Sequence, residues 1–209
     1  LEGVAPTKKH AVFTIAVPTT AGTAAEVTIN YVITDVEKKR KFVCVDTNDI
    51  PEVAVIDPDM MASMPKGLTA ATGMDALTHA VEAFIGNSTS IQTRRLSLEA
   101  VRLIFANLEL AYQEGTNRKA RENMLQAAYL AGIAFSKSYV GYIHAVAHSL
   151  GGQYNTPHGL ANAVLMPIVL EAYGKAAHRK LHALGVAAGV CVEADDHAKG
   201  AKAFIQAIR

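Results

Sequence analysis

The sequence has few cysteines and almost no net charge. Its two cysteines, Cys44 and Cys191, lie far apart and belong to no CxxC pair, which is typical of a reduced, cytosolic setting without disulfides. Twenty lysines and arginines balance 19 aspartates and glutamates, so the formal charge of +1 does not favour nucleic acid or an anionic membrane as a partner. No apolar run approaches the roughly 18 residues that span a bilayer. These absences predict a cytoplasmic protein without nucleic-acid or membrane partners.

The hydrophobic pattern changes period along the chain. Half of the 209 residues are hydrophobic, which is enough for one substantial domain or two small ones. We expect strands at residues 12–17, 27–34, 41–45 and 53–56, the first and last of them buried. After Pro65 the period becomes helical, and we expect helices at residues 69–85, 91–111, 118–136, 141–150, 159–174, 176–188 and 196–209.

The predicted fold class is therefore α/β followed by all-α. A β-containing part occupies residues 1–62, and a helical domain occupies residues 63–209. Both ends look cut, because the first strand has no preceding partner and the last helix lacks a terminating glycine. We expect the chain to be a piece of a longer protein.

The stretch GMDALTHAVEAF places Asp75 and His79 four residues apart in a predicted helix. Side chains at this spacing project from one face, about one turn apart. Alone, such a pair is usually part of a solvated face. Here the flanking residues are small or apolar, so the helix is predicted to be buried. A buried carboxylate beside a buried imidazole needs a partner, and a cation would serve.

The stretch HAVAHSLGGQYNTPHG adds His144, His148 and His158. We expect Gly151 and Gly152 to break the helix and let His158 return beside it. One buried histidine is usually only hydrogen-bonded, but three of them with an Asp/His pair predict a metal site. Imidazoles with one carboxylate and no thiolate suit Fe²⁺ or Zn²⁺ and match Ca²⁺ or Mg²⁺ poorly.

The stretch PTTAGTAAEVT, residues 18–28, follows the first predicted strand. Small residues here would let the backbone and threonine hydroxyls approach a phosphate or ribose closely. There is no GxGxxG pattern, so a simple tight turn explains the stretch equally well. We expect the cationic run at 38–41 to be a solvated turn and Cys44 to be a core strand residue. The remaining histidines are expected at the surface: His10, His178, His182 and His197.

These stretches, together with DPDMMASMP and HGLANAVLMP, resemble signature blocks of the iron-containing (group III) alcohol dehydrogenases. The resemblance runs over nearly the whole chain and fades after about Tyr173. It implies a dehydroquinate-synthase-like fold, with an α/β nucleotide domain followed by a helical metal domain and an active site in the cleft between them. By the same comparison the chain lacks the first nucleotide-binding half, with its GGGS-type pyrophosphate loop, and the last helices.

The resemblance also implies the roles of individual residues. Asp75, His79, His144 and His158 would bind Fe²⁺ or Zn²⁺, and His148 would handle a proton near the substrate. The residues facing NAD(P) would be Thr19, Thr20, Thr23, Thr28, Lys39 and Met61. The implied reaction is hydride transfer between a nicotinamide and a small primary alcohol, diol or aldehyde of the lactaldehyde and propanediol type. The intact protein would be a homodimer.

Two other readings of the same residues remain open. Three histidines and an aspartate can also activate water, as in a metallohydrolase. The chain could instead be a metal-binding fragment without activity of its own.

Overall fold

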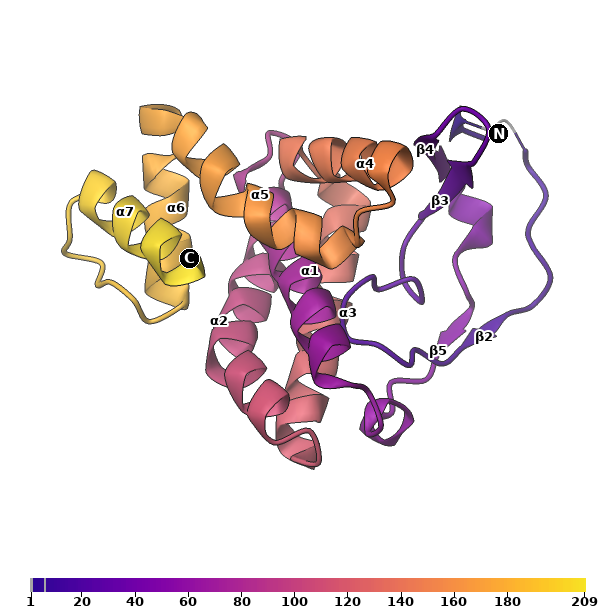
Figure 1. Cartoon of the computed structure of the whole chain (residues 1–209), viewed down its shortest axis with the longest axis horizontal. Helices are drawn as coiled ribbons and strands as arrows, with labels where there is room; N and C mark the ends of the chain where they lie inside the picture. Colours follow the sequence, from indigo (N-terminus) through magenta and orange to yellow (C-terminus); the bar gives the residue numbers. More distant parts are fainter. Residues whose placement is uncertain (1, 6) are drawn as a thin grey trace.

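The computed structural model describes residues 2–5 and 7–209, in which short strands precede a set of helices (Figure 1). The strands are β1 (Gly3–Val4), β2 (Ile15–Ala16), β3 (Asn30–Asp35), β4 (Arg40–Val45) and β5 (Val53–Ala54). The helices are α1 (Lys66–Ile85), α2 (Ile91–Gln113), α3 (Arg118–Ser138), α4 (Tyr142–Tyr154), α5 (His158–Ala172), α6 (His178–Ala187) and α7 (His197–Ile208). Figure 1 shows the strands gathered on one side of the helices, with α6 and α7 at the opposite end. The division at residue 62 stays a prediction.

The strands form two small sheets. β3 and β4 make an antiparallel hairpin in which Tyr31 pairs with Cys44, and β1 joins the other edge of β4 in parallel. Cys44 is buried, as expected. β2 and β5 pair in parallel over two residues each. The prediction that residues 12–17 and 53–56 are buried strands is wrong, because this short ladder leaves their side chains exposed; Phe13, for example, is 69% exposed.

Helix α1 lies at the centre of the helical part and packs against α2, α3 and α5. Thirteen of its twenty residues are buried, which confirms the prediction of a buried helix. Small side chains at many of its positions allow neighbouring helices to approach from several sides. The surrounding core contains large fully buried side chains such as Ile104, Leu125, Leu181 and Phe204. Any polar side chain on α1 that faces inward must therefore find its partners inside the protein.

Gly151 and Gly152 lie inside α4 and do not break it, so that prediction is wrong. The helix ends at Tyr154, and the chain turns at Asn155, which has a left-handed backbone with φ 55° and ψ 31°. The glycines instead permit close packing on β4. A Cβ atom at Gly152 would lie 2.7 Å from the Cα of Arg40 and from the backbone N of Lys41. This contact fixes α4 against the hairpin.

His182 is buried, at 5% exposed, so its predicted surface position is wrong. Its Nε2 donates to the carbonyl of Val192 at 3.0 Å, and its Nδ1 lies 2.8 Å from Nδ1 of His197. Because Nε2 carries the hydrogen in this arrangement, Nδ1 accepts from His197. The pair joins the start of α7 to α6.

Within residues 2–5 and 7–209, the structure contains no helix with the length and apolar character needed to cross a membrane.

Gly159 brings the start of α5 against α1. A Cβ atom there would collide with the backbone of Ala71, and α1 cannot move that backbone away without disturbing the helix. We expect Gly159→Ala to lower the free energy of unfolding by about 1–3 kcal/mol, as for other overpacked sites. Urea denaturation of the two proteins measures the difference.

Gly67 supplies a matched control, because a Cβ atom at this position on α1 meets no atom within 4 Å. Gly67→Ala should therefore leave stability unchanged or raise it by up to about 1 kcal/mol, through helix propensity alone. Equal effects at the two positions would contradict the packing argument.

Candidate metal centre

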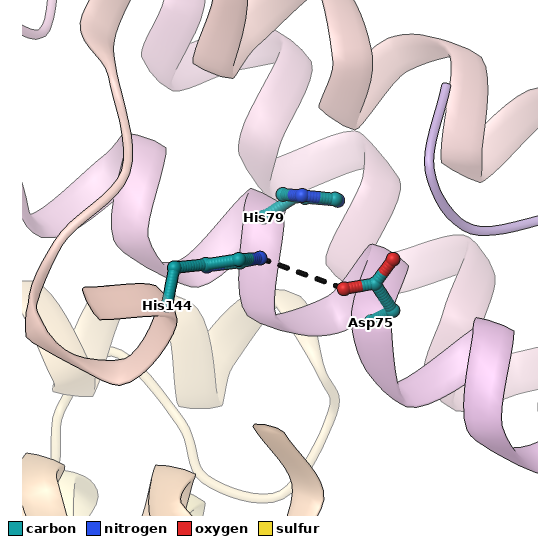
Figure 2. A group of neighbouring side chains, drawn as sticks. All are labelled: Asp75, His79 and His144. Atoms are coloured by element: carbon teal, nitrogen blue, oxygen red, sulfur yellow. Dashed lines mark ion pairs between the residues drawn. The ribbon is translucent and has the colours of Figure 1, made fainter. Parts of the chain in front are cut away.

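Three helices bring the four predicted metal ligands together. Asp75 and His79 come from successive turns of α1, His144 comes from α4, and His158 is the first residue of α5. The ligand atoms of Asp75, His79 and His144 lie within 4.8 Å of one another, and Figure 2 shows His144 and Asp75 pointing at each other with the ring of His79 beside them. Oδ1 of Asp75 lies 3.5 Å from Nε2 of His144 and 3.3 Å from Nε2 of His158. One ion could contact all four side chains.

Burial shapes the protonation of this group. Asp75 is only 3% exposed, and burial would raise its pKa, but the charges and hydrogen bonds of the neighbouring histidines lower that pKa well below its usual value. Burial lowers the pKa of His79 to about 4, so this imidazole is neutral at pH 7. A carboxylate and a neutral imidazole are the forms that bind a divalent ion.

The ring of His79 is held by stacking on both faces. Phe135 on α3 lies on one side, with ring centroids 4.2 Å apart, and His144 lies on the other at 4.4 Å. Nδ1 of His79 is buried and has no hydrogen-bond partner among the described residues. A fixed, neutral imidazole with an unpartnered buried nitrogen fits a bound metal ion.

Glu82, which the sequence reasoning did not single out, fixes His144. It lies on α1 and is buried, and its Oε2 is 2.6 Å from Nδ1 of His144. Its Oε1 accepts a 2.7 Å hydrogen bond from the backbone N of Ile143. Nδ1 of His144 therefore carries a hydrogen, and Nε2 is directed at Asp75. A carboxylate behind a ligating histidine is the usual way to orient the ring and raise its basicity.

The same contacts change the proton affinity of His144. Burial opposes protonation of the ring, but the hydrogen bonds to Asp75 and Glu82 outweigh it and raise the pKa of His144 to about 9. A metal ion and a proton would thus compete for Nε2. The signal for Glu82 was present in the sequence, because it is a lone acid between apolar residues, three positions after His79.

Asn162 also lies at this centre and was missed. It follows His158 by one turn of α5 and is fully buried. Its Nδ2 donates to Oδ1 of Asp75 at 2.8 Å and lies 3.3 Å from His144 Nε2 and 3.2 Å from His158 Nε2. Asn162 thus positions the side chains of Asp75, His144 and His158, which come from three different helices. Its spacing of four from His158 was the only sequence signal.

The metal centre forms part of the wall of a cavity of about 590 Å³, a size typical of small-molecule and cofactor sites. His148 follows His144 by one turn of α4 and lines the same space. Burial, aided by the nearby His158, His144 and Lys41, lowers the pKa of His148 to about 4. Its imidazole is therefore neutral at pH 7.

The predicted dinucleotide residues are only partly brought together here. Thr23 and Thr28 line the cavity. The lining does not include Thr19, Thr20, Lys39 or Met61. Met61 is buried in the helical core, and Lys39 is exposed in the hairpin turn between β3 and β4.

Lys41 lines the cavity, so the prediction that the whole run at 38–41 is a solvated turn is wrong for this residue. It lies on β4, and successive side chains of a strand alternate between its two faces. Lys41, Val43 and Val45 accordingly all face the cavity. Counting by twos along the predicted strand would have revealed this position.

The Glu82–His144 contact predicts the effect of Glu82→Gln. Both groups that meet this side chain donate hydrogens, whereas a glutamine offers one oxygen and one NH₂ group. To keep both bonds, His144 must move its hydrogen to Nε2, which then cannot bind a metal. We expect Zn²⁺ affinity, measured by competition with a chelator, to fall by about 10–100-fold.

Glu193→Gln is the matched control, because Glu193 is exposed. It should bind Zn²⁺ as tightly as the unaltered chain. Unchanged affinity in Glu82→Gln would show that Glu82 does not set the tautomer of His144.

Comparison with known proteins gives consistent matches. Residues 69–209 match "Fe-containing alcohol dehydrogenase family, C-terminal", and residues 2–58 match "Iron-containing alcohol dehydrogenase". Lactaldehyde reductase of Escherichia coli (strain K12) is 47% identical over 208 residues, which cover 100% of this chain and 54% of that protein. NAD-dependent methanol dehydrogenase of Bacillus methanolicus is 42% identical over 168 residues, covering 80% of this chain and 44% of that protein.

The fold is matched as well. A solved structure of 1,3-propanediol oxidoreductase has a TM-score of 0.94 at 43% identity, over 99% of this chain and 54% of that one. The chain spans about half the length of the curated relatives it matches. These relatives are alcohol and aldehyde oxidoreductases by name, and the family matches together cover most of the sequence. The predicted fold class and resemblance are therefore confirmed, and the chain belongs to the iron-containing alcohol dehydrogenase family.

Proposed function

We propose that this chain carries the metal site of an enzyme that transfers hydride reversibly between NAD(P) and a small primary alcohol, diol or aldehyde. The observation that carries the proposal is the convergence of Asp75, His79, His144 and His158 at one wall of a cavity that Thr23 and Thr28 also line. The names of the relatives support the substrate class, since they include a lactaldehyde reductase, a 1,3-propanediol oxidoreductase and an NAD-dependent methanol dehydrogenase.

The four ligands would hold Fe²⁺ or Zn²⁺. When bound, such an ion supplies a Lewis acid for the alcohol or aldehyde oxygen, and a nicotinamide supplies the hydride acceptor or donor. Asp75 contributes the negative charge of the site, and Glu82 and Asn162 keep the ligating heads in place. His148, neutral and within the cavity, would take the alcohol proton and pass it toward solvent.

The cavity also contains groups suited to the dinucleotide. Thr23 and Thr28 offer hydroxyls, and Lys41 offers a cation for a phosphate. Thr19, Thr20, Lys39 and Met61 stay as predicted contacts from the resemblance alone. Because the chain spans about half of its relatives, we propose metal binding for the chain itself and full turnover for the whole protein. A homodimer of the whole protein also stays a prediction.

Metal content tests the centre directly. We expect the purified chain, reconstituted with Fe²⁺ or Zn²⁺, to retain about one ion per chain after gel filtration, because the donor set matches these metals. Asp75→Ala should retain far less. Asp49→Ala, which removes an exposed carboxylate, should retain as much as the unaltered chain. Equal metal content in all three proteins would refute the assignment.

His148→Ala separates proton transfer from metal binding. In the whole protein we expect this variant to keep its metal, because the four ligands are intact, while nicotinamide reduction by a primary alcohol falls by about 10²–10⁴-fold. Elemental analysis and absorbance measure the two effects. Loss of metal together with activity would mean that His148 acts as a ligand.

The same assays distinguish the other two readings. Nicotinamide-dependent oxidation of an alcohol by this chain alone would rule out a metal-binding fragment without activity of its own. Turnover of esters or phosphate esters without any dinucleotide would identify a metallohydrolase.

A further inference from the structure

Tyr139 follows α3 and has φ 66° and ψ 179°. Residues with a side chain rarely adopt this combination, which is almost confined to glycine. Such strain persists only where the surrounding structure imposes it, and it is concentrated at active sites and ligand clamps. A large side chain thus occupies a position whose backbone conformation would suit glycine better, and this choice of residue needs a physical explanation.

The neighbouring contacts explain the backbone but not the side chain. The N–H of Tyr139 donates to the carbonyl of Phe135 at 2.7 Å and closes α3. Two residues later, Gly141 packs so closely on Glu82 that a Cβ atom there would lie 2.9 Å from Oε1. The linker between α3 and α4 is thus fixed at both ends. The side chain of Tyr139 is 58% exposed, so core packing does not demand a tyrosine.

The place of Tyr139 in the cavity wall explains why a tyrosine occupies this position. It lines the same cavity as the metal centre, together with Val140, Phe135 and His79. Phe135, four residues before Tyr139 on α3, stacks on the ring of His79, a predicted metal ligand. A phenol ring here forms part of the wall that surrounds any molecule bound at the centre.

We propose that Tyr139 is a specificity-determining residue whose ring limits the size of the alcohol or aldehyde that can reach the metal. The inference rests on the proposed function for the class of substrate. Small alcohols and diols fit beside the ring, whereas bulky substituents collide with it. The strained backbone is retained because a glycine in its place would remove the wall.

Three variants separate strain from size. Tyr139→Gly removes both the strain and the wall, Tyr139→Ala removes the wall but keeps a Cβ atom, and Tyr139→Phe keeps both. Thermal unfolding of the metal-free chain should therefore show a higher Tm for Tyr139→Gly than for Tyr139→Ala or the unaltered chain. Tyr139→Phe should unfold like the unaltered chain.

Substrate size is tested on the chain loaded with Co²⁺, whose visible spectrum reports binding without turnover. We expect Tyr139→Gly and Tyr139→Ala to bind benzyl alcohol roughly 10-fold more tightly than the unaltered chain, with 1,2-propanediol changed less than about twofold. Tyr142→Ala is the matched control. Tyr142 is also exposed and lies three residues away, but it lines a different cavity.

Each outcome supports or overturns the proposal. A cobalt spectrum with an unchanged ratio of the two affinities in Tyr139→Gly and Tyr139→Ala would overturn the role of Tyr139 while leaving the metal centre intact. An equal shift in Tyr142→Ala would also overturn it, and no rise in Tm for Tyr139→Gly would contradict the explanation from backbone strain. If the unaltered chain gives no cobalt spectrum, the metal centre and this role both fail.

Discussion

The carboxylate of Asp75 lies inside the protein, and a charge in that position must be compensated by groups beside it. His79 approaches from the same helix, while His144 and His158 approach from α4 and α5. Asn162 donates to the same carboxylate oxygen. The arrangement of the helices around α1 therefore depends on these polar contacts as well as on the apolar core.

Close packing places these helices accurately. Gly159 allows the start of α5 to lie against the backbone of α1, and Gly152 allows α4 to lie against β4. Each glycine stands where a Cβ atom would collide with backbone, so neither contact could form with a larger residue. These contacts set the positions of His158, His144 and His148 relative to Asp75. Accuracy of this order matters, because a metal site tolerates only small errors in the positions of its ligands.

The cavity lies between the β3–β4 hairpin and the helices, so both parts of the chain contribute to it. The helices supply acidic and imidazole groups, and the hairpin supplies apolar side chains and Lys41. In the proposed function, the helices would hold the metal and Lys41 would face a phosphate of the dinucleotide. Tyr139 lies between α3 and α4 and lines the same cavity as His79. The chain thus combines a rigid centre with a strained, partly exposed wall.

The sequence alone predicted the helical part and the hairpin, because hydrophobic spacing is a local property, and it singled out the histidines and the aspartate of the candidate metal centre. It did not reveal Glu82 or Asn162, because their partners are far away in the sequence. His144 follows Glu82 by 62 positions, and Asp75 precedes Asn162 by 87 positions. It misplaced His182 for the same reason, since burial comes from α7 folding over α6. It also treated Gly151 and Gly152 as a helix break, although their function is contact with β4. Local spacing fixes which side chains share a helix face, but only the packing of helices decides which groups from different segments meet.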